Sequence, residues 1–261
     1  MFNERLPKEI REEIQNQDII GQTSGMCPGY AQGNLVILPK AYAFDFLLFS
    51  MRNPKPCPIL EVVESGKILS LTAPGEPVTK VFPKYRVYED GKLSGEYTDI
   101  EHLWQEDFVT FILGCSFTFE SALLEAEIAM RHIEQNKNVA MYQTSIPCKE
   151  AGFFKGNVVV SMRPIKSEEV MTAVEITSKY PKVHGAPIHI GNPLAIGIHD
   201  IEKPDFGDPI EIKEGEIPVF WACGVTPQSV AMTVKPPVMI THAPGHMLIT
   251  DIKNSSLEGV K

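Results

Sequence analysis

The hexapeptide FVTFIL (Phe108–Leu113) opens the part of the sequence that decides the fold. From there to about His199, apolar strand-like segments alternate with helix-like ones. In order they are FVTFIL (108–113), FTFESALLEAEIAMRHI (117–133), VAMYQT (139–144), NVVVSM (157–162), SEEVMTAVEITSK (167–179) and PIHI (187–190). This β-α-β-β-α-β order is typical of the split, ferredoxin-like α+β arrangement.

Both helices of this run are predicted from local signals. Apolar residues recur at helical intervals from Phe119 to Ile133, which predicts one helix across that range. The second helix has Ser167 as a plausible N-cap, two glutamates in its first turn, Lys179 in its last turn and Pro181 as a stop. The middle of the chain is therefore expected to be regular and compact.

The flanking segments predict a second, larger lobe. Leu6, Ile10 and Ile14 are spaced for a short amphipathic helix, and 34–38 resembles a buried strand. Residues 201–261 contain short strands and Pro/Gly loops that do not easily form a core alone. We therefore expect an α/β lobe from residues 1–99 and 201–261, with an α+β lobe of residues 100–200 inserted into it.

Charge and hydropathy limit the classes of partner. The 261 residues include 24 Lys and Arg against 33 Asp and Glu, a formal net charge of −9. A nucleic acid selects a basic face, which this balance argues against. The longest apolar runs, near 41–51 and 108–119, are shorter than the roughly 20 residues that span a bilayer. We expect neither a nucleic acid nor a membrane as partner.

The cysteines indicate a reducing compartment. The N-terminal segment MFNERLPKEIREEI has no apolar stretch typical of a secretory signal. An odd number of widely spaced cysteines fits neither a disulfide framework nor a zinc ribbon. We expect buried or site-lining thiols in a cytoplasmic protein, at Cys27, Cys57, Cys115, Cys148 and Cys223.

Glycine and proline gather in loops that also carry polar side chains. There are 19 Gly and 21 Pro in the chain, and shaped loops of this composition often hold ligands. The clusters are TSGMCPGY (23–30), RNPKPCP (52–58), GCSFTFE (114–120), HGAPIHIGNP (184–193) and the pair FWACGVTPQ (220–228) with THAPGHMLITD (241–251).

The histidines in these loops are candidates for acid–base chemistry. His242 and His246 have the i, i+4 spacing of a zinc site, but Pro244 and Gly245 lie between them and disfavour a helix. A metal site, a hydrogen-bonded loop and a general acid/base role all stay open. His184 lies in a similar loop, and histidine titrates nearest to neutral pH.

Two further sets of residues are suited to an acidic ligand. The Gly114–Ser116 turn lies between a strand and a helix, where backbone N–H groups favour an anion or the Cys115 thiolate; a buried cysteine in a tight turn is the alternative. Glu120 follows in the first helical turn. Arg52 and Arg163, each next to a proline, are candidates to bind a carboxylate bidentately, with surface ion pairs as the alternative.

Long motifs across the chain resemble the D-glutamate cyclase family, in its bacterial hydro-lyase branch. They run from about Gly21 to Ile252. The resemblance implies a two-lobe fold and the conversion of D-glutamate to 5-oxo-D-proline with loss of water, without a required cofactor. The motifs are TSGMCPGYAQGNLVILP, DFLLFSMRNPKPCP, FILGCSFTFESAL, GNVVVSMRP, HGAPIHIGNPLAIGI, PVFWACGVTPQ and ITHAPGHMLITD.

For such a cyclisation we expect four roles. Arg52 or Arg163 binds the α-carboxylate, and His242 or His246, with His184 as a substitute, takes the ammonium proton. Glu120 or a histidinium helps water leave. Backbone N–H groups of 114–116 or of Ser24 and Gly25 stabilise the oxyanion. Further expected substrate contacts are Asn53, Ser116 and Trp221.

Three alternatives remain at this point. In one variant, Cys115 is a nucleophile and forms a thioester that the amine resolves. A second alternative is a dehydratase or hydratase of another small acid, with a divalent metal held by histidine and Asp251. The third is a non-catalytic protein that binds an acidic metabolite. In each case the partner is a small acidic metabolite, and a homodimer is the default assembly.

Overall fold

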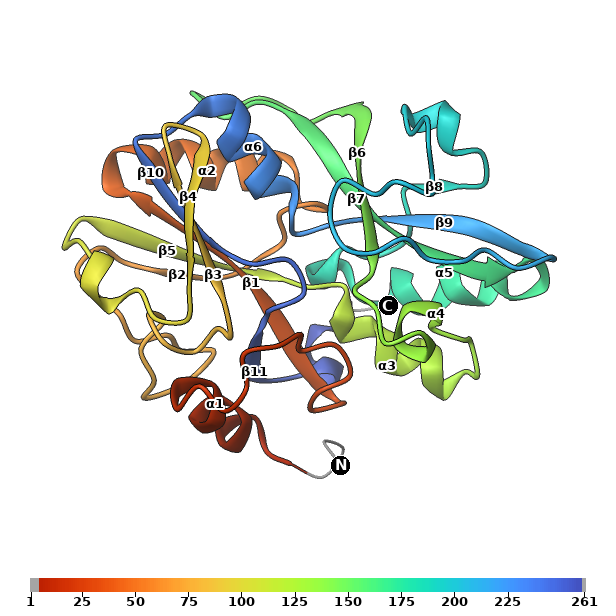
Figure 1. Cartoon of the computed structure of the whole chain (residues 1–261), viewed down its shortest axis with the longest axis horizontal. Coiled ribbons are helices and arrows are strands. Elements are labelled where there is room, and N and C mark those ends of the chain that lie inside the picture. Colours follow the sequence, from red (N-terminus) through yellow and green to blue (C-terminus); the bar gives the residue numbers. More distant parts are fainter. Residues whose placement is uncertain (1–4, 260–261) are drawn as a thin grey trace.

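Two antiparallel sheets build the protein (Figure 1). The computed structural model describes residues 5–259. The seven-stranded sheet has the order β2-β5-β1-β10-β3-β4, with β11 also paired to β1, and the four-stranded sheet has the order β6-β7-β9-β8. The strands are β1 (Tyr30–Pro39), β2 (Ile59–Val63), β3 (Tyr85–Glu89), β4 (Lys92–Tyr97), β5 (Phe108–Gly114), β6 (Ala140–Pro147), β7 (Asn157–Lys166), β8 (His189–Ile190), β9 (Glu216–Ala222), β10 (Val238–His242) and β11 (Leu248–Lys253).

Six helices and several single turns connect the strands in the described part of the chain. In Figure 1, α2 and α6 lie at the top of the view and α3 to α5 lie beside the four-stranded sheet. The helices are α1 (Pro7–Gln15), α2 (Lys40–Arg52), α3 (Phe117–Glu125), α4 (Arg131–Glu134), α5 (Val170–Ser178) and α6 (Thr226–Val234). None of them has the length and apolarity needed to cross a bilayer.

Strand β1 organises the larger sheet. One of its edges pairs with β5 along residues 33–39. Its other edge is shared: β10 pairs with Val36 and Ile37, and β11 pairs with residues up to Gly33. The loop of residues 243–247, which joins β10 to β11, therefore lies beside β1 at the point where the pairing with β10 ends and that with β11 begins. Every residue of β1 after Tyr30 is buried, because neighbours cover both edges and both faces of the sheet.

The two sheets share one apolar core. The Phe46 ring on α2 meets the Phe111 ring of β5 edge-on at 4.8 Å between centroids, and the Phe154 ring of the β6–β7 connection at 5.3 Å. All three rings are fully or almost fully buried. Burying such large aromatic surfaces contributes strongly to folding, so the sheets stabilise each other.

The expected mixed α and β fold is confirmed, but the strands pair differently from the expectation. β5 was expected to open a ferredoxin-like unit, and it instead lies inside the seven-stranded sheet between β1 and β2. β9 lies between β7 and β8. The sheets therefore do not divide at residues 100 and 201, since the hydrophobic pattern that identifies a strand does not specify its partner.

The predicted helix from Phe119 to Ile133 is wrong in length. α3 ends at Glu125, Glu127 has a left-handed φ of 61°, and a separate short α4 follows. A residue with a positive φ breaks the helical path, so apolar residues beyond it are buried without continuing α3. The second predicted helix is confirmed as α5, and Ser167 begins a 3₁₀ turn in front of it rather than capping it.

Candidate functional site

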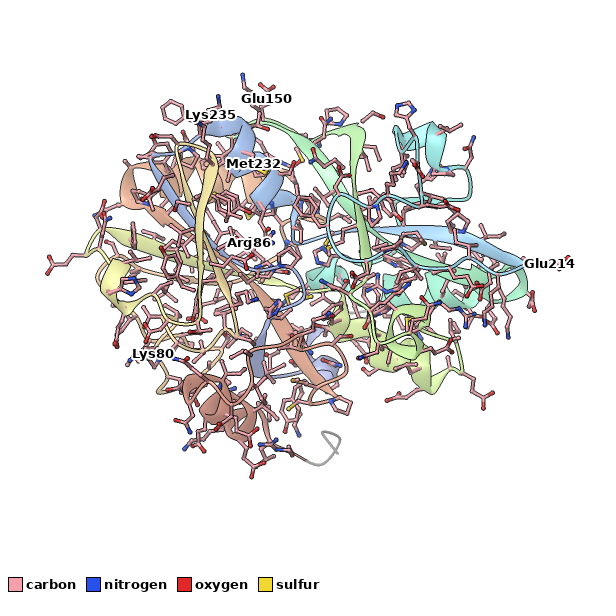
Figure 2. The ribbon with its side chains drawn as sticks, in the orientation of Figure 1. Lys80, Arg86, Glu150, Glu214, Met232 and Lys235 are labelled. Atoms are coloured by element: carbon pink, nitrogen blue, oxygen red, sulfur yellow. The ribbon has the colours of Figure 1, made fainter. Side chains whose placement is uncertain are left out.

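A cavity of about 440 Å³ lies where the two sheets meet. Its volume is within the roughly 300–1,000 Å³ typical of small-molecule sites. Figure 2 labels one of its residues, Arg86, near the centre of the view. The lining comes from the β3–β4 hairpin, the start of β6, a loop before β9 and the β10–β11 loop: Lys84, Arg86, Glu96, Asn138, Asp205, Phe206, Gly207, Ala243, Pro244 and His246.

One wall of the cavity is cationic. Arg86 and Glu96 are directly opposed in the β3–β4 ladder, and Arg86 Nε donates to Glu96 Oε1 at 2.8 Å. Lys84 Nζ lies 3.8 Å from Glu96 Oε2. The hydrogen bond from Arg86 lowers the pKa of Glu96 below its ordinary value. Two cations share one carboxylate here, which leaves this wall with a positive charge.

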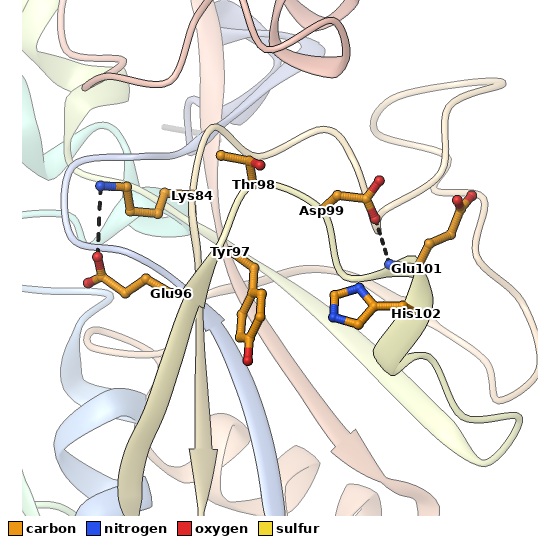
Figure 3. A pocket seen from close by; sticks show the side chains of 7 residues that line it. All are labelled: Lys84, Glu96, Tyr97, Thr98, Asp99, Glu101 and His102. Carbon is orange, nitrogen blue, oxygen red and sulfur yellow. Dashed lines mark hydrogen bonds and ion pairs between the residues drawn. The ribbon is translucent and has the colours of Figure 1, made fainter.

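The Lys84–Glu96 pair also lines a second, outer cavity of about 960 Å³. Figure 3 shows this pair beside Tyr97 and Thr98, with Asp99 and His102 further along the same hollow. Because both residues belong to both linings, the ion pair lies between the outer cavity and the inner one.

His246 contributes a neutral imidazole to the inner cavity. Its Nδ1 lies 3.0 Å from the carbonyl oxygen of Pro244, and because a carbonyl only accepts, Nδ1 carries the proton. The lone pair is therefore on Nε2. Burial is the largest cause lowering the pKa of His246, aided by Lys84 and Arg86. The ring is thus unprotonated at neutral pH and suited to accept a proton.

His242 has the opposite tautomer. The backbone N–H of Leu35 donates to its Nδ1 at 3.1 Å, so the neutral ring carries its proton on Nε2. The residue is fully buried, and burial above all lowers its pKa to about 3. His242 ends β10 at the point where β10 and β11 part from β1. This tautomer offers an N–H and no free lone pair, so the geometry supports a base at His246 and not at His242.

Another wall of the cavity is fixed to β6. Asp205 accepts from the Gln143 N–H at 2.7 Å, and Asp208 accepts from the Asn138 N–H at 2.8 Å. The Asn138 side chain donates through Nδ2 to the same Pro244 carbonyl that accepts from His246. Gly245 passes so close that a Cβ there would lie 2.8 Å from Asn138 Nδ2, and its φ is +86°. Only glycine fits this approach without strain.

Several predicted site residues form a separate, buried cluster. Arg163, on β7, donates through Nε to Glu120 Oε1 at 2.9 Å and through Nη2 to Ser116 Oγ at 3.1 Å. Its guanidinium lies 5.5 Å from the ring centroid of Trp221, whose indole N–H donates to Thr177. All these side chains are buried. The cluster joins α3 to the four-stranded sheet, and none of its members lines the inner cavity.

The electrostatics of this cluster suit an ion pair better than proton transfer. Burial by itself raises the pKa of Glu120, but His132 and Arg163 outweigh it and lower that pKa to about 2. Glu120 therefore stays ionised and holds no proton to donate at neutral pH. Burial also raises the pKa of the Cys115 thiol far above its ordinary value, which disfavours the thiolate needed for a thioester.

Side chains of the RNPKPCP segment form hydrogen bonds to backbone atoms and do not line the inner cavity. Arg52 donates to the Glu150 carbonyl, and Asn53 exchanges two hydrogen bonds with the backbone of Lys149. The Nδ1–H of His184 donates to the Lys55 carbonyl at 2.6 Å. Burial mainly lowers the pKa of His184, to about 4. These residues connect loops of the two sheets and lie outside the inner cavity.

The glycine-rich loop of residues 23–30 does not line the inner cavity. Gly25 lines a different cavity of about 450 Å³, together with Phe117 and Leu124 of α3. Ser24 precedes it, with an Oγ that is buried and has no partner among residues 5–259. The structure therefore does not bring Ser24 or Gly25 to the cavity that contains His246.

Sequence reasoning missed most of the cavity wall, namely Lys84, Arg86, Glu96, Asn138 and Asp205. One signal was available, because residues two apart in a strand share a face. Lys84 and Arg86 in KYRVYED have this spacing, which places two cations side by side. The pairing that brings Glu96 to them, and the loop that brings Asp205, depend on tertiary structure.

The suggested metal site is not assembled in the described part of the chain. Residues 5–259 contain no group of three or more His, Cys, Asp or Glu side chains placed to hold an ion. Asp251, suggested as a ligand, instead accepts from Arg11 Nη1 at 2.9 Å.

Comparison with known proteins gives a consistent family. A family model described as D-glutamate cyclase matches residues 109–251. A Clostridium beijerinckii protein named "Putative hydro-lyase" is 60% identical, over 98% of this chain and 98% of its own. Relatives of that description from Geobacillus kaustophilus (60% identical, 96% of this chain and 95% of the relative) and Bacillus subtilis (58%, 96% and 98%) agree with it. The chain belongs to the D-glutamate cyclase family and is an enzyme of the hydro-lyase class.

Proposed function

We propose that the protein cyclises D-glutamate to 5-oxo-D-proline, with loss of water, in the cavity between the two sheets. The observation that carries this proposal is one cavity that presents two cations, Lys84 and Arg86, and a neutral imidazole with a free Nε2, His246. The family membership points to the same reaction.

The charges of the cavity complement those of the substrate. D-Glutamate has two carboxylates and one ammonium group. Lys84 and Arg86 match the carboxylates, and an arginine can bind one of them through two parallel hydrogen bonds. The Nε of Arg86 donates to Glu96 and the guanidinium lies near the Tyr88 hydroxyl, but no hydrogen bond of ordinary geometry ties its two terminal nitrogens to another residue within 5–259. They are therefore available to a ligand.

The reaction needs proton transfer but no outside reagent. The α-nitrogen bonds to the γ-carboxyl carbon, and one C–O bond of that carboxyl breaks. Two protons leave the ammonium group and both end on the departing oxygen, which becomes water. His246 Nε2 accepts each proton from nitrogen and returns it to oxygen, so the imidazole is regenerated. Neither a redox cofactor nor ATP enters this balance.

Binding supplies much of the acceleration. The nucleophile and the electrophile are already in one substrate molecule, so binding D-glutamate in a curled conformation removes most of the entropic barrier. An anionic carboxylate is a poor electrophile. Lys84 and Arg86 would make the γ-carboxyl carbon more electrophilic by withdrawing negative charge from its oxygens. Protonating such a group at pH 7 costs about 3.7 kcal/mol from its reference pKa of about 4.3.

The test is a pair of histidine variants. His246→Ala is expected to lower kcat for D-glutamate by about 10²- to 10⁴-fold, since it removes the general base. His189→Ala is the matched control, because His189 lies on β8 and does not line the cavity. Conversion is followed by proton NMR of D-glutamate and 5-oxoproline. Wild-type turnover in His246→Ala, or no conversion of D-glutamate by the wild type, contradicts the proposal.

A cytoplasmic location and a homodimer remain predictions. The five cysteines at positions 27, 57, 115, 148 and 223 are all free and buried, which fits a reducing compartment.

A further inference from the structure

The part of the cavity lining outside the β3–β4 hairpin contains hydrogen-bond acceptors. Asp205, an exposed residue, lines the cavity, and of its two carboxylate oxygens only Oδ2 is engaged, by the Gln143 N–H. Asn138 also lines it and is 8% exposed. Its Nδ2 is committed to the Pro244 carbonyl, so its amide orientation is fixed, and its Oδ1 has no partner among residues 5–259. A buried unpaired acceptor costs about 1–3 kcal/mol, which a donor from a ligand would recover.

The two acceptors are placed rigidly. The Asp205–Asp208 segment lies against β6 through two backbone hydrogen bonds between Phe206 and Met141, of 2.9 and 3.1 Å. Gly207 within it has a φ of +76°, and a Cβ there would lie 2.0 Å from the Val139 carbonyl oxygen. Such close packing leaves this wall little freedom to rearrange, so its acceptors face a ligand in a fixed arrangement.

His246 Nε2 adds a third acceptor to the same cavity, by the tautomer described above. An ammonium group has three N–H donors and a positive charge, whereas a hydroxyl group has one donor and no charge. An amino group, unlike a hydroxyl group, can therefore satisfy several of these acceptors together and also pair with the Asp205 carboxylate.

We propose that Asp205 and Asn138 form an ammonium subsite that makes the enzyme selective for amino dicarboxylates over hydroxy dicarboxylates. This inference rests on the proposed function, because it places the α-amino group of the substrate against this wall. Asp205 then acts in binding: it raises affinity for the amino acid without taking part in proton transfer.

The experiment compares two ligands that differ in one group, D-aspartate and D-malate. Neither can close an unstrained ring, so equilibrium binding is measured by calorimetry without turnover. Wild-type protein is expected to bind D-aspartate about 10- to 100-fold more tightly than D-malate, as a charge-assisted hydrogen bond would give. Asp205→Asn keeps an oxygen for the Gln143 N–H and removes the charge, so this ratio is expected to fall at least about fivefold, with D-malate affinity little changed.

Asp208→Asn is the matched control. Asp208 makes the same kind of carboxylate-to-backbone bond, to the Asn138 N–H, but does not line the cavity. Its ratio is expected to equal that of the wild type. Asn138→Ser is a second variant, expected to lower the ratio because it loses Oδ1.

Three results would overturn the subsite. They are a wild-type ratio near one, an unchanged ratio in Asp205→Asn, or equal weakening of both ligands in that variant. Conversion of D-glutamate is measured separately. An enzyme that converts D-glutamate but keeps its ratio in Asp205→Asn retains the proposed function and loses this subsite. An enzyme whose affinity ratio falls in Asp205→Asn as expected, but which does not convert D-glutamate, retains this subsite and loses the proposed function.

Discussion

Two regions of the molecule bring an arginine, a glutamate and a histidine together, and only one of them is suited to bind a substrate. In the inter-sheet cavity, Arg86 pairs with Glu96 beside His246, at the edge of open space. In the cluster on α3 and β7, Arg163 pairs with Glu120, and His132 Nε2 lies 3.2 Å from the same carboxylate.

The difference lies in what the side chains have left to offer. Arg163 is fully buried and donates to Glu120, Ser161 and Ser116. Arg86 is 24% exposed in its side chain and donates through Nε to Glu96. Residue type does not distinguish a structural ion pair from a binding one, whereas unused donors beside a cavity do.

The largest expected effect separates the two arginines by stability. Arg163→Met leaves the Glu120 charge buried without its arginine partner and is expected to lower the free energy of unfolding by about 3–5 kcal/mol. Arg86→Met, at the rim, is expected to cost less than about 1 kcal/mol. Urea denaturation at pH 7 measures both. Equal losses would mean that the two pairs have the same structural role.

Acid should destabilise the buried end of β10 and the α3–β7 cluster in different pH windows. The folded-state pKa of His242, about 3, is below its unfolded value near 6.5, so its contribution is present above pH 6.5 and is lost as pH falls toward 3. The loss is about 2–3 kcal/mol by pH 4.5. Glu120, with a folded pKa of about 2, loses its contribution only as pH falls below about 4.3. His242→Asn should make the upper limb less steep, the remaining slope coming from His184, whose pKa is also lowered, and Glu120→Gln should flatten the lower limb, each measured by urea denaturation across pH. Flattening of the same limb by both variants would contradict this separation.

Arg86 should matter more for activity than for stability. Arg86→Met is expected to lower kcat/KM for D-glutamate about 10- to 100-fold, because a charge-assisted bond to a substrate carboxylate is lost. The control is Lys80→Met: Lys80, labelled in Figure 2, pairs with Asp99 and does not line the inner cavity. Initial rates at several substrate concentrations give kcat/KM for both variants. A normal kcat/KM in Arg86→Met would mean that the substrate carboxylate does not bind at Arg86.

The smallest expected effect concerns Cys115. Its thiol is buried and its raised pKa keeps it protonated, so Cys115→Ala is expected to keep kcat within about twofold of the wild type. The melting temperature serves as the check on folding. A large loss of kcat at an unchanged melting temperature would instead indicate a covalent role for this thiol.

Local features of this protein were predictable, and pairings between distant segments were not. The periodicity of residues 108–113, 139–144 and 157–162 located strands β5, β6 and β7. The same pattern placed β5 in the wrong sheet, because an apolar hexamer fits any buried position in a sheet.

The candidate site shows the same limit. Pro244 and Gly245 correctly predicted a loop around His246, since neither fits a helix interior. Arg163 next to Pro164 looked available from sequence, but its partners come from α3, more than 40 residues away in the chain. Sequence spacing identifies side chains able to bind an acid and does not reveal which are already engaged.

The shared edge of β1 separates folding from chemistry. The register of β10 is set by Val36 and Ile37, and that of β11 by Gln32 and Gly33. Neither strand depends on the five residues between them to find its place. Substitutions at His246, the one residue of this loop that is not buried, can therefore vary the chemistry of the cavity while the sheet stays in register, whereas Gly245 admits no side chain without strain. This makes His246 the position where directed evolution of the enzyme should begin.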